Sequence, residues 1–277
     1  MEVEDAIILL AGEGSRMFPA SMYCPKEFLP LVDTPLMHHL VWEIIRAGIK
    51  RIHLVTSNEK LPFVEKMIIG SKNMSLLRPE LNPISYNPVP ENVDVLVHIQ
   101  NKSLGVGDAI SIGCQSISGP FLVVLGDNAL IKDAPEPQDF GPSNASNASS
   151  ILVNDYIQKK IPCVGVMEMP DSEIHKYGVV DVKNDLLKSI IEKPTLAMAP
   201  SNLILCGRYL FPSGSYEILQ KIKQAKNNEE LSINFLKYLV NTTSVSVVEL
   251  NDFYLCDSGN PLSWFKSQEK ILLKRIK

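Results

Sequence analysis

Residues 11–33 form a segment in which glycines stand beside two strong cations, in the order AGEGSRMFPASMYCPKEFLPLVD. Gly12 and Gly14 have no side chain, so a ligand can approach the backbone closely at these positions. Arg16 supplies a planar fork of N–H donors, Lys26 supplies a compact positive charge, and three prolines stiffen the chain around them. Together these groups suit the phosphates of a triphosphate bound in an extended conformation.

Two better-known phosphate-binding motifs do not account for this segment. The dinucleotide fingerprint G-x-G-x-x-G, with an acid about 20 residues later, is matched only in part by Gly12, Gly14 and Asp33, because the third glycine is missing. That motif also needs a helix directly after the glycines, and prolines at positions 19, 25 and 30 forbid one. A Walker A loop requires the ending G-K-[ST], which the segment lacks. What remains is a stiff, cationic loop of another type.

Further residues capable of chemistry stand at the ends of apolar runs. Asp127 lies in VVLGDN, Asp257 lies in LCDSGNP, and IIEKP contains the pair Glu192 and Lys193. The carboxyl ends of strands are where α/β sheets place ligand-binding groups, but turns and helix caps also favour aspartate. The pair in IIEKP equally suits a surface salt bridge. The residues by themselves leave both interpretations open.

The elements that must position these groups show a clear pattern. Strand-length apolar runs alternate with helical patterns in the first part of the chain, and shorter strands dominate after residue 160. We expect strands at 6–10, 51–56, 94–99, 121–126, 163–169, 178–182, 189–193, 203–211 and 244–250, and helices at 35–49, 61–70, 106–116, 215–224, 229–240 and 261–276. Such alternation favours a mostly parallel sheet with helices on both faces.

No linker or internal repeat divides the chain. The prediction is therefore a single α/β domain over residues 1–277, with one half at about 1–160 and another at about 161–277 that includes a C-terminal helix. Residues 78–92 contain four prolines and are expected to be non-helical. Residues 136–150 are rich in turn-forming residues and are expected to be a mobile surface excursion.

Composition excludes several classes of partner. The net charge of −4 lacks the basic excess of a nucleic-acid-binding protein. No run approaches the roughly 18 apolar residues of a membrane span, and the acidic start MEVEDAIILL is unlike a signal peptide. Five cysteines without a CxxC pair indicate reduced thiols. We therefore expect a cytoplasmic protein without nucleic-acid or membrane partners.

The order of motifs resembles a known family. The pattern G-x-G-S-R-M-x-P-A-x4-P-K-E-x-L-P-L-V-D-x-P-L is similar to the signature of sugar-1-phosphate nucleotidylyltransferases, and the triplet PKE is typical of their bacterial UTP–glucose-1-phosphate uridylyltransferase branch. Further matches follow in the same order: VLGDN at 124–128, YGVV at 177–180, IEKP at 191–194, APSNLILCGRYLF at 199–211 and CDSGNP at 256–261. The resemblance covers nearly the whole chain.

This resemblance implies a fold, a reaction and a set of roles. The fold would be a single Rossmann-like domain of the nucleotide-diphospho-sugar transferase type, with a mixed, mostly parallel sheet. The reaction would transfer uridylyl from UTP to α-D-glucose 1-phosphate, with Mg²⁺ as the cofactor, in a homo-oligomer. The implied site residues are Arg16, Lys26 and Lys193 for catalysis, Ala11, Gly12, Gly14, Gln100 and Gly105 for the nucleotide, Gly178 and Glu192 for the sugar, and Asp127 and Asp257 for the metal. In LGVGDAI (104–110), Gly105 and Gly107 would admit the base.

The sequence also departs from the family pattern. Met22 stands where relatives have lysine, Ser15 stands where they have threonine, and NNEELSINFLKYL (227–239) replaces a glycine-rich element that serves pocket closure and assembly. A related transferase for another base or sugar, such as a thymidylyl or an N-acetylhexosamine-phosphate enzyme, therefore stays open. A non-catalytic regulatory paralogue is a further alternative, against which the retained charged residues argue.

Overall fold

The computed structural model describes residues 2–70, 78–81, 83–133, 139–225 and 231–276. In these residues a nine-stranded sheet runs through the molecule in the order β5-β4-β1-β6-β11-β8-β12-β10-β9. Its strands are β1 Asp5–Leu9, β4 Arg51–Thr56, β5 Asp94–Ile99, β6 Phe121–Leu125, β8 Cys163–Glu168, β9 Gly178–Lys183, β10 Leu186–Glu192, β11 Leu203–Phe211 and β12 Ser246–Glu249. A strand was expected in each of these places.

The sheet is mixed. β1 pairs in parallel with β4 and β6, β4 pairs in parallel with β5, and β8 pairs in parallel with β12. β11 is antiparallel to β6, β8 and β9, and β10 is antiparallel to β9 and β12. The parallel strands of the N-terminal half therefore end at one common edge, and the antiparallel pairings gather in the C-terminal half.

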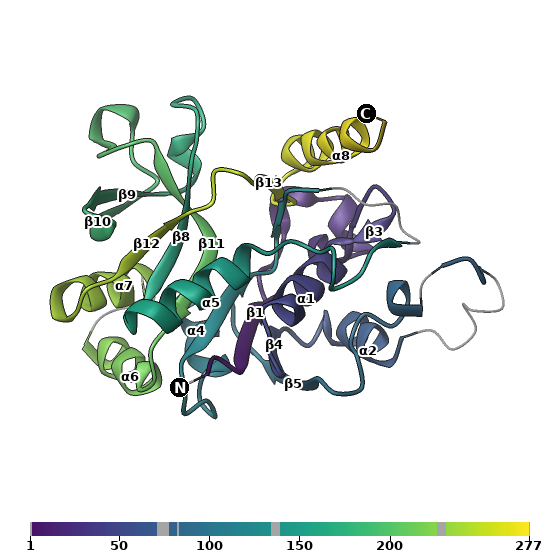
Figure 1. Cartoon of the computed structure of the whole chain (residues 1–277), viewed down its shortest axis with the longest axis horizontal. Coiled ribbons are helices and arrows are strands. Elements are labelled where there is room, and N and C mark those ends of the chain that lie inside the picture. Colours follow the sequence, from purple (N-terminus) through teal and green to yellow (C-terminus); the bar gives the residue numbers. More distant parts are fainter. Residues whose placement is uncertain (1, 71–77, 82, 134–138, 226–230, 277) are drawn as a thin grey trace.

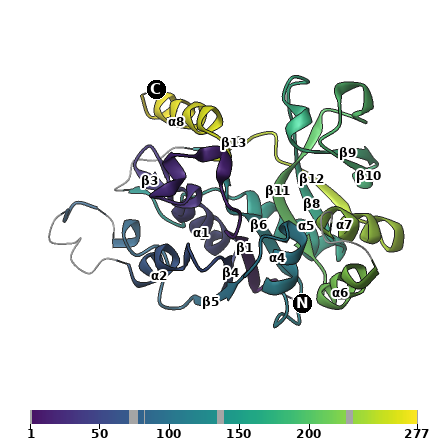
Figure 2. The same cartoon turned by 180° about the vertical axis from the view of Figure 1, so that it is seen from behind.

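Helices cover both faces of the sheet, as the alternating pattern predicts (Figures 1 and 2). The helices are α1 Leu36–Arg46, α2 Leu61–Ile69, α4 Val106–Gly113, α5 Ala148–Lys159, α6 Ser215–Ala225, α7 Leu231–Thr242 and α8 Pro261–Ile276. The core under α1, α2 and α5 contains Trp42, and the core under α4, α6 and α7 contains Phe235. Because both faces are buried, the central strands are apolar on both sides.

Two small pairs of strands lie outside the main sheet. β7 Asn128–Ile131 is antiparallel to β13 Tyr254–Asp257, with Asn128 opposite Asp257. β2 Pro30–Leu31 is antiparallel to β3 Thr34–Pro35, and α8 packs beside it. Neither pair was expected from the sequence. The first pair matters because Asn128 directly follows Asp127. It therefore brings the two predicted metal ligands, Asp127 and Asp257, near each other.

The prediction of a mobile surface excursion at 136–150 is wrong for the residues that the structure describes. Residues 136–138 lie outside the described residues, but Phe140, Ala145 and Ala148 are buried, and α5 begins at Ala148. The ring of Phe140 packs against Trp42 with 4.7 Å between centroids. The buried Phe140 ring, together with the buried Ala145 and Ala148, holds this turn-rich segment on the core.

Residues 78–92 were expected to be non-helical, and their described part contains no α-helix. Its one helical element is the short 3-10 turn Pro83–Ser85. Residue 82 lies outside the described residues. Within the described part of the chain, the helices lack the combination of length and apolar character needed to cross a membrane.

Candidate active site

The segment 11–33 folds as a series of short turns in place of the helix that a dinucleotide fingerprint would need. Three 3-10 turns, η1 Ser15–Met17, η2 Ala20–Met22 and η3 Lys26–Phe28, follow one another between β1 and β2. Gly14 precedes the first turn with a φ of +67°, a left-handed conformation that favours glycine. A Cβ atom at Gly14 would lie 3.6 Å from the side chain of Lys26, so the loop closes back on itself at this point.

A buried lysine anchors this loop. Lys60 Nζ donates to the carbonyls of Leu10 at 2.8 Å and Gly12 at 2.5 Å, and it lies 2.9 Å from both carboxylate oxygens of Glu27. Burial raises the pKa of Glu27, while the charge of Lys60 opposes that shift. The ammonium therefore ties both ends of the loop to the start of α2. Sequence reasoning missed Lys60, because a lone lysine before a helix resembles a surface residue.

Two of the predicted site residues form an ion pair. Lys26 Nζ lies 2.6 Å from Asp127 Oδ2, and the lysine side chain is 10% exposed. Asp127 lies two residues after the end of β6, at the carboxyl edge of the parallel strands, where α/β sheets bind ligands. The structure thus brings a predicted catalytic lysine and a predicted metal ligand together.

The two predicted metal ligands are neighbours across the β7–β13 pair. The backbone N–H and the hydroxyl of Ser258 both donate to the carbonyl of Asp127, at 2.9 and 3.0 Å. The carboxylate of Asp257 accepts the N–H of Gly259 at 2.7 Å. Burial raises the pKa of Asp257, and the negative charge of Asp127 raises it further. A cation between the two carboxylates would relieve this repulsion, so the pair fits a hard divalent ion.

The described residues supply few other metal ligands. They contain no group of three or more His, Cys, Asp or Glu side chains arranged to hold a metal ion. A magnesium ion at this place would take its remaining ligands from water and phosphate oxygens, which is how Mg²⁺ usually binds in phosphoryl-transfer sites.

A fully buried ion pair fixes the backbone behind Asp127. The guanidinium of Arg208, on β11, donates to both carboxylate oxygens of Glu43, on α1, at 2.7 and 2.9 Å. It also donates to the side-chain and backbone oxygens of Asn128 at 2.8 and 3.3 Å, and to the carbonyl of Gly207 at 3.2 Å. All five N–H groups of Arg208 are therefore used. This network joins α1, β7 and β11 immediately beside the carboxylate pair.

Four predicted nucleotide-binding residues line one cavity of about 170 Å³ between the loop and α4. These are Ala11, Gly12, Gln100 and Gly105, and Lys26 and Asp127 line the same cavity. A second, open cavity of about 400 Å³ is lined by Gly14, Arg16, Lys26, Ser103 and Gly259, among others. Lys26 borders both cavities, so it lies between the place where a base would fit and the place where phosphates would extend.

Gly107 has a different role from the one expected. A Cβ atom at Gly107 would lie 2.4 Å from the backbone nitrogen of Ser232 and 2.6 Å from the Cβ of Leu231. The missing side chain therefore makes room for the first turn of α7 rather than for a base. Residues 227–230 of the altered segment lie outside the described residues, and its remainder begins α7.

The two predicted sugar-binding residues and the predicted catalytic residue Lys193 meet in the C-terminal half. Gly178 pairs with Glu192 across β9 and β10, and a Cβ atom at Gly178 would lie 3.0 Å from the carboxylate of Glu192. Lys193 has a φ of +45°, and its N–H donates to the carbonyl of Tyr177 at 3.0 Å. Its Nζ lies 3.5 Å from Glu192 Oε1, with 62% of the side chain exposed. Burial, and then the nearby charges of Asp257 and Asp127, raise the pKa of Tyr177.

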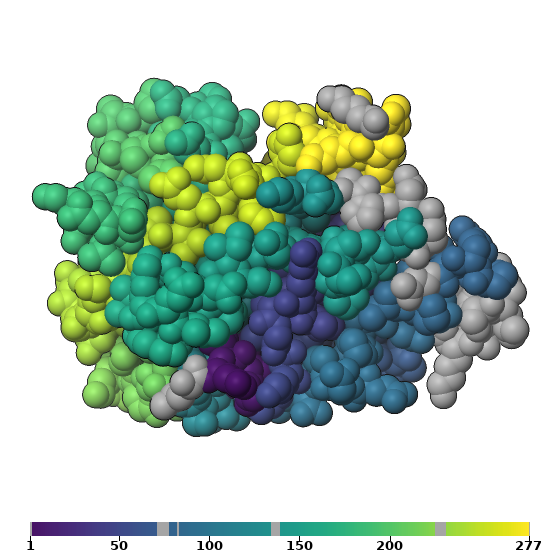
Figure 3. Space-filling view, viewed as in Figure 1, coloured from purple at the N-terminus to yellow at the C-terminus, as the bar shows by residue number. Residues whose placement is uncertain are grey.

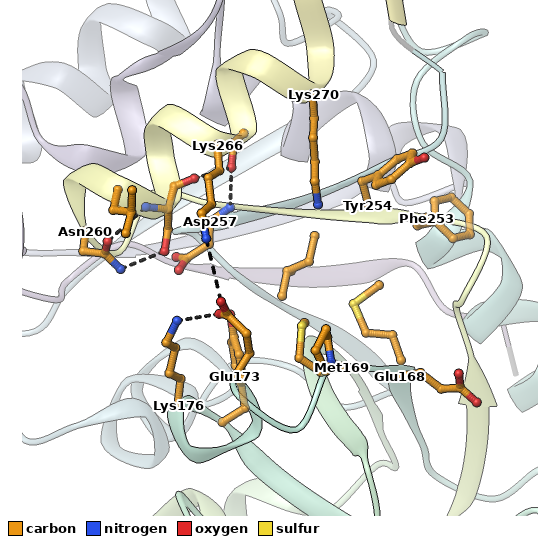
Figure 4. Close-up of a pocket in the computed structure, with 17 residues that line it drawn as sticks. Glu168, Met169, Glu173, Lys176, Phe253, Tyr254, Asp257, Asn260, Lys266 and Lys270 are labelled. Atoms are coloured by element: carbon orange, nitrogen blue, oxygen red, sulfur yellow. Dashed lines mark hydrogen bonds and ion pairs between the residues drawn. The ribbon is translucent and has the colours of Figure 1, made fainter. Parts of the chain in front are cut away.

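A third cavity, of about 340 Å³, separates α8 from the turn η6 Ile174–Lys176 (Figure 4). Lys266 on α8 reaches across it to Glu173 at 3.8 Å, and the space-filling view shows a notch between α8 and the rest of the C-terminal half (Figure 3). Its charged lining residues balance in sign: Lys176, Lys266 and Lys270 against Glu168, Glu173 and Asp257. This cavity therefore favours neither a cationic nor an anionic ligand.

Known proteins resemble this chain over most of its length. A UTP–glucose-1-phosphate uridylyltransferase of Staphylococcus haemolyticus is 29% identical over 286 residues, covering 99% of this chain and 93% of the relative. A second one, from Staphylococcus saprophyticus, is 31% identical over 242 residues, covering 83% of this chain and 79% of the relative.

Solved structures match over a similar extent. Apo UDP-glucose pyrophosphorylase superposes with a TM-score of 0.83 at 26% identity, covering 99% of both chains. The UTP-bound enzyme of Acinetobacter baumannii gives a TM-score of 0.79 at 26% identity, covering 97% of this chain and 93% of the other. The sequence profile of the nucleotidyl transferases matches residues 5–274. Because that profile spans nearly the whole length, this chain belongs to the nucleotidyl transferase family.

Proposed function

We propose that this protein transfers a uridylyl group from UTP to α-D-glucose 1-phosphate and releases pyrophosphate. The relatives carry the name of this activity, and similar structures have been solved with UTP and with UDP-glucose. The observation that carries the proposal is the position of Lys26, which lies 2.6 Å from Asp127 and borders both cavities beside the opening loop. A cation there is placed to meet the reacting phosphate of a nucleotide.

In this proposal the nucleotide lies along the loop. The base enters the cavity lined by Ala11, Gly12, Gln100 and Gly105. The triphosphate extends past Gly14 toward Arg16, which borders the open cavity together with Lys26. Arg16 is a rigid fork suited to two phosphate oxygens, and Lys26 is a point charge suited to the α-phosphate.

The sugar phosphate approaches from the other half of the molecule. Glu192 and the backbone at Gly178 would bind the sugar hydroxyls, and Lys193 would hold the phosphate that attacks. An oxygen of that phosphate forms a bond to the α-phosphorus of UTP, and the bond from that phosphorus to the oxygen of pyrophosphate breaks. The protein's own contribution is to align the two substrates and to offset the charge that develops on the phosphates.

Asp127 and Asp257 are the residues that would hold a divalent ion, which we propose is Mg²⁺. When bound, this ion would supply charge neutralisation at the phosphates. The carboxylate of Asp127 would then interact with both the ammonium of Lys26 and the metal ion.

A pyrophosphate-release assay over a grid of nucleoside triphosphates and sugar 1-phosphates tests the proposal. We expect the highest kcat/KM for UTP with glucose 1-phosphate. A clear preference for dTTP or for N-acetylglucosamine 1-phosphate would assign the protein to the related transferases instead. Absence of release with every pair, in a protein that is folded and supplied with Mg²⁺, would favour a non-catalytic paralogue.

We also propose that the protein forms a homo-oligomer in the cytoplasm. Five large apolar side chains of α8 are exposed, namely Leu262, Phe265, Leu272, Leu273 and Ile276, and a second copy would bury them. All five cysteines are free thiols, as is usual in a reducing compartment. Light scattering coupled to size exclusion measures the oligomeric state, and a monomer at micromolar concentration would contradict the proposal.

A further inference from the structure

Gln100 lies at the wall of the proposed base cavity with both of its amide hydrogens already used. Its Nε2 donates to Asp108 Oδ2 at 2.8 Å and to the carbonyl of Gly105 at 3.3 Å. No described residue donates to the side-chain oxygen of Gln100, and this oxygen is not among the buried polar atoms that lack a partner. The carbonyl oxygen is therefore the group of this side chain left to meet a ligand.

Asp108 decides which end of the amide faces inward. It lies on α4, is 3% exposed, and its other carboxylate oxygen lies 2.6 Å from Lys223 Nζ on α6. Figure 2 shows α4 and α6 on the same side of the sheet. A carboxylate in a salt bridge only accepts hydrogen bonds, so the amide of Gln100 must turn its NH₂ group toward Asp108. The reverse orientation would place two oxygens against each other.

We propose that Asp108, held by Lys223, is a positioning residue that selects the nucleotide base by fixing the polarity of the Gln100 amide. The inference rests on the base site of the proposed function. The carbonyl oxygen of Gln100 can accept the N3–H of uracil or thymine. Cytosine has an unprotonated N3 at the same place, so two acceptors would oppose each other and the base would be rejected.

Asp108→Asn inverts this polarity with almost no change in shape. The Lys223 ammonium will hold the side-chain oxygen of the new asparagine, which then turns its NH₂ group toward Gln100. Gln100 then accepts that bond, gives up its longer 3.3 Å contact to the carbonyl of Gly105, and presents its own NH₂ group to the base. We expect the ratio of kcat/KM for UTP to that for CTP to fall by at least about 10-fold.

Gln220→Ala is the matched control. Gln220 lies one turn from Lys223 on α6 and donates to Ser111 on α4 at 2.8 Å, so its loss removes a polar contact between the same two helices without touching Gln100. We expect the UTP-to-CTP ratio of this variant to equal that of the wild type. If Asp108→Asn acted only by loosening the packing of α4 against α6, the UTP-to-CTP ratio would change in both variants.

Calorimetric titration of UTP, CTP and N3-methyl-UTP separates this inference from the proposed reaction. If the wild type binds UTP much more tightly than CTP and Asp108→Asn reduces that ratio, the inference holds even where no sugar phosphate supports pyrophosphate release. An unchanged ratio in folded Asp108→Asn overturns it. If that variant does not fold, titration of N3-methyl-UTP into the wild type provides the test, because this nucleotide lacks the N3–H donor. Should the wild type bind N3-methyl-UTP as tightly as UTP, the inference is overturned as well.

Discussion

At the scale of single residues, Lys26 and Arg16 serve the same loop in different ways. Lys26 is mostly buried and paired with Asp127 at 2.6 Å, whereas Arg16 borders the open cavity beside Gly259. A flexible ammonium near the α-phosphate suits charge that develops during the reaction, and a guanidinium fork suits phosphates that are already charged. The loss of Lys26 and the loss of Arg16 should therefore change different kinetic constants.

Lys26→Ala should lower kcat with little change in UTP affinity, which indicates a contact made in the transition state. Arg16→Ala should instead raise the KM for UTP, and for pyrophosphate in the reverse direction, because Arg16 would bind the leaving group. Single-turnover rates of both variants check this. A wild-type kcat with only a raised KM in Lys26→Ala would mean that Lys26 serves ground-state binding alone.

Asp257→Asn should lower turnover by at least about 100-fold at saturating Mg²⁺, comparable to the loss of other preorganised charge stabilisation. The pKa of Asp257 is raised by burial and by Asp127, so a cation at this pair would compensate an unfavourable charge. Turnover is measured as initial pyrophosphate release over a series of Mg²⁺ concentrations. Near-wild-type turnover in a variant with an unchanged melting temperature would remove Asp257 from the site.

At the scale of the elements, the buried pair Arg208–Glu43 connects the sheet to α1. The two side chains are 0% and 1% exposed, so neither charge can be solvated if its partner is lost. The pair also positions Asn128, the residue that lies between Asp127 and the rest of β7. Stability and site geometry therefore depend on the same contact.

Arg208→Met alone should destabilise the fold by about 3–5 kcal/mol, because it leaves the Glu43 carboxylate buried without its partner. The double variant Glu43→Leu with Arg208→Met should recover most of this loss, since apolar residues of similar volume replace a buried pair well. Urea denaturation measures both. If the double variant is no more stable than the single one, the loss arises from packing and not from an unpaired charge.

At the scale of the whole molecule, a buried histidine makes the fold sensitive to acid. His39 is 6% exposed, its ring packs 4.6 Å from the centroid of Phe140, and burial lowers its pKa to about 3. The unfolded chain binds a proton at His39 below about pH 6.5, whereas the folded chain does not bind it until about pH 3. The stability contributed by neutral His39 is thus complete above pH 6.5 and declines as the pH falls.

Between pH 6.5 and pH 5 this decline should amount to about 2 kcal/mol. Urea unfolding at a series of pH values measures the slope, and His39→Leu should reduce it. The carboxyl of Asp5, with a pKa lowered to about 2, titrates below this window and therefore does not contribute to the slope. A slope that is identical in the wild type and His39→Leu would show that the ring gains access to water before the chain unfolds.

Much of the architecture could be predicted because its signals are local. The strands 51–56, 94–99 and 203–211 and the helix 261–276 lie where their apolar patterns place them. The strand pairs β7–β13 and β2–β3 could not be predicted, since runs of two to four residues carry no periodicity. The turn-rich residues before α5 do form turns, but the burial of Phe140 and Ala145 places these turns against the core, and burial depends on contacts distant in the sequence.

The sequence by itself determined the chemical groups of the opening loop, the alternation of strands and helices, and the likeness to a family. Only the tertiary structure decided which charges meet. Lys26 pairs with Asp127, 101 residues away, Arg208 pairs with Glu43, 165 residues away, and Lys223 pairs with Asp108, 115 residues away. Hydrophobic periodicity specifies each element separately, but an ion pair depends on the order of strands in the sheet and on the helix packed above them, and neither is encoded in a local pattern.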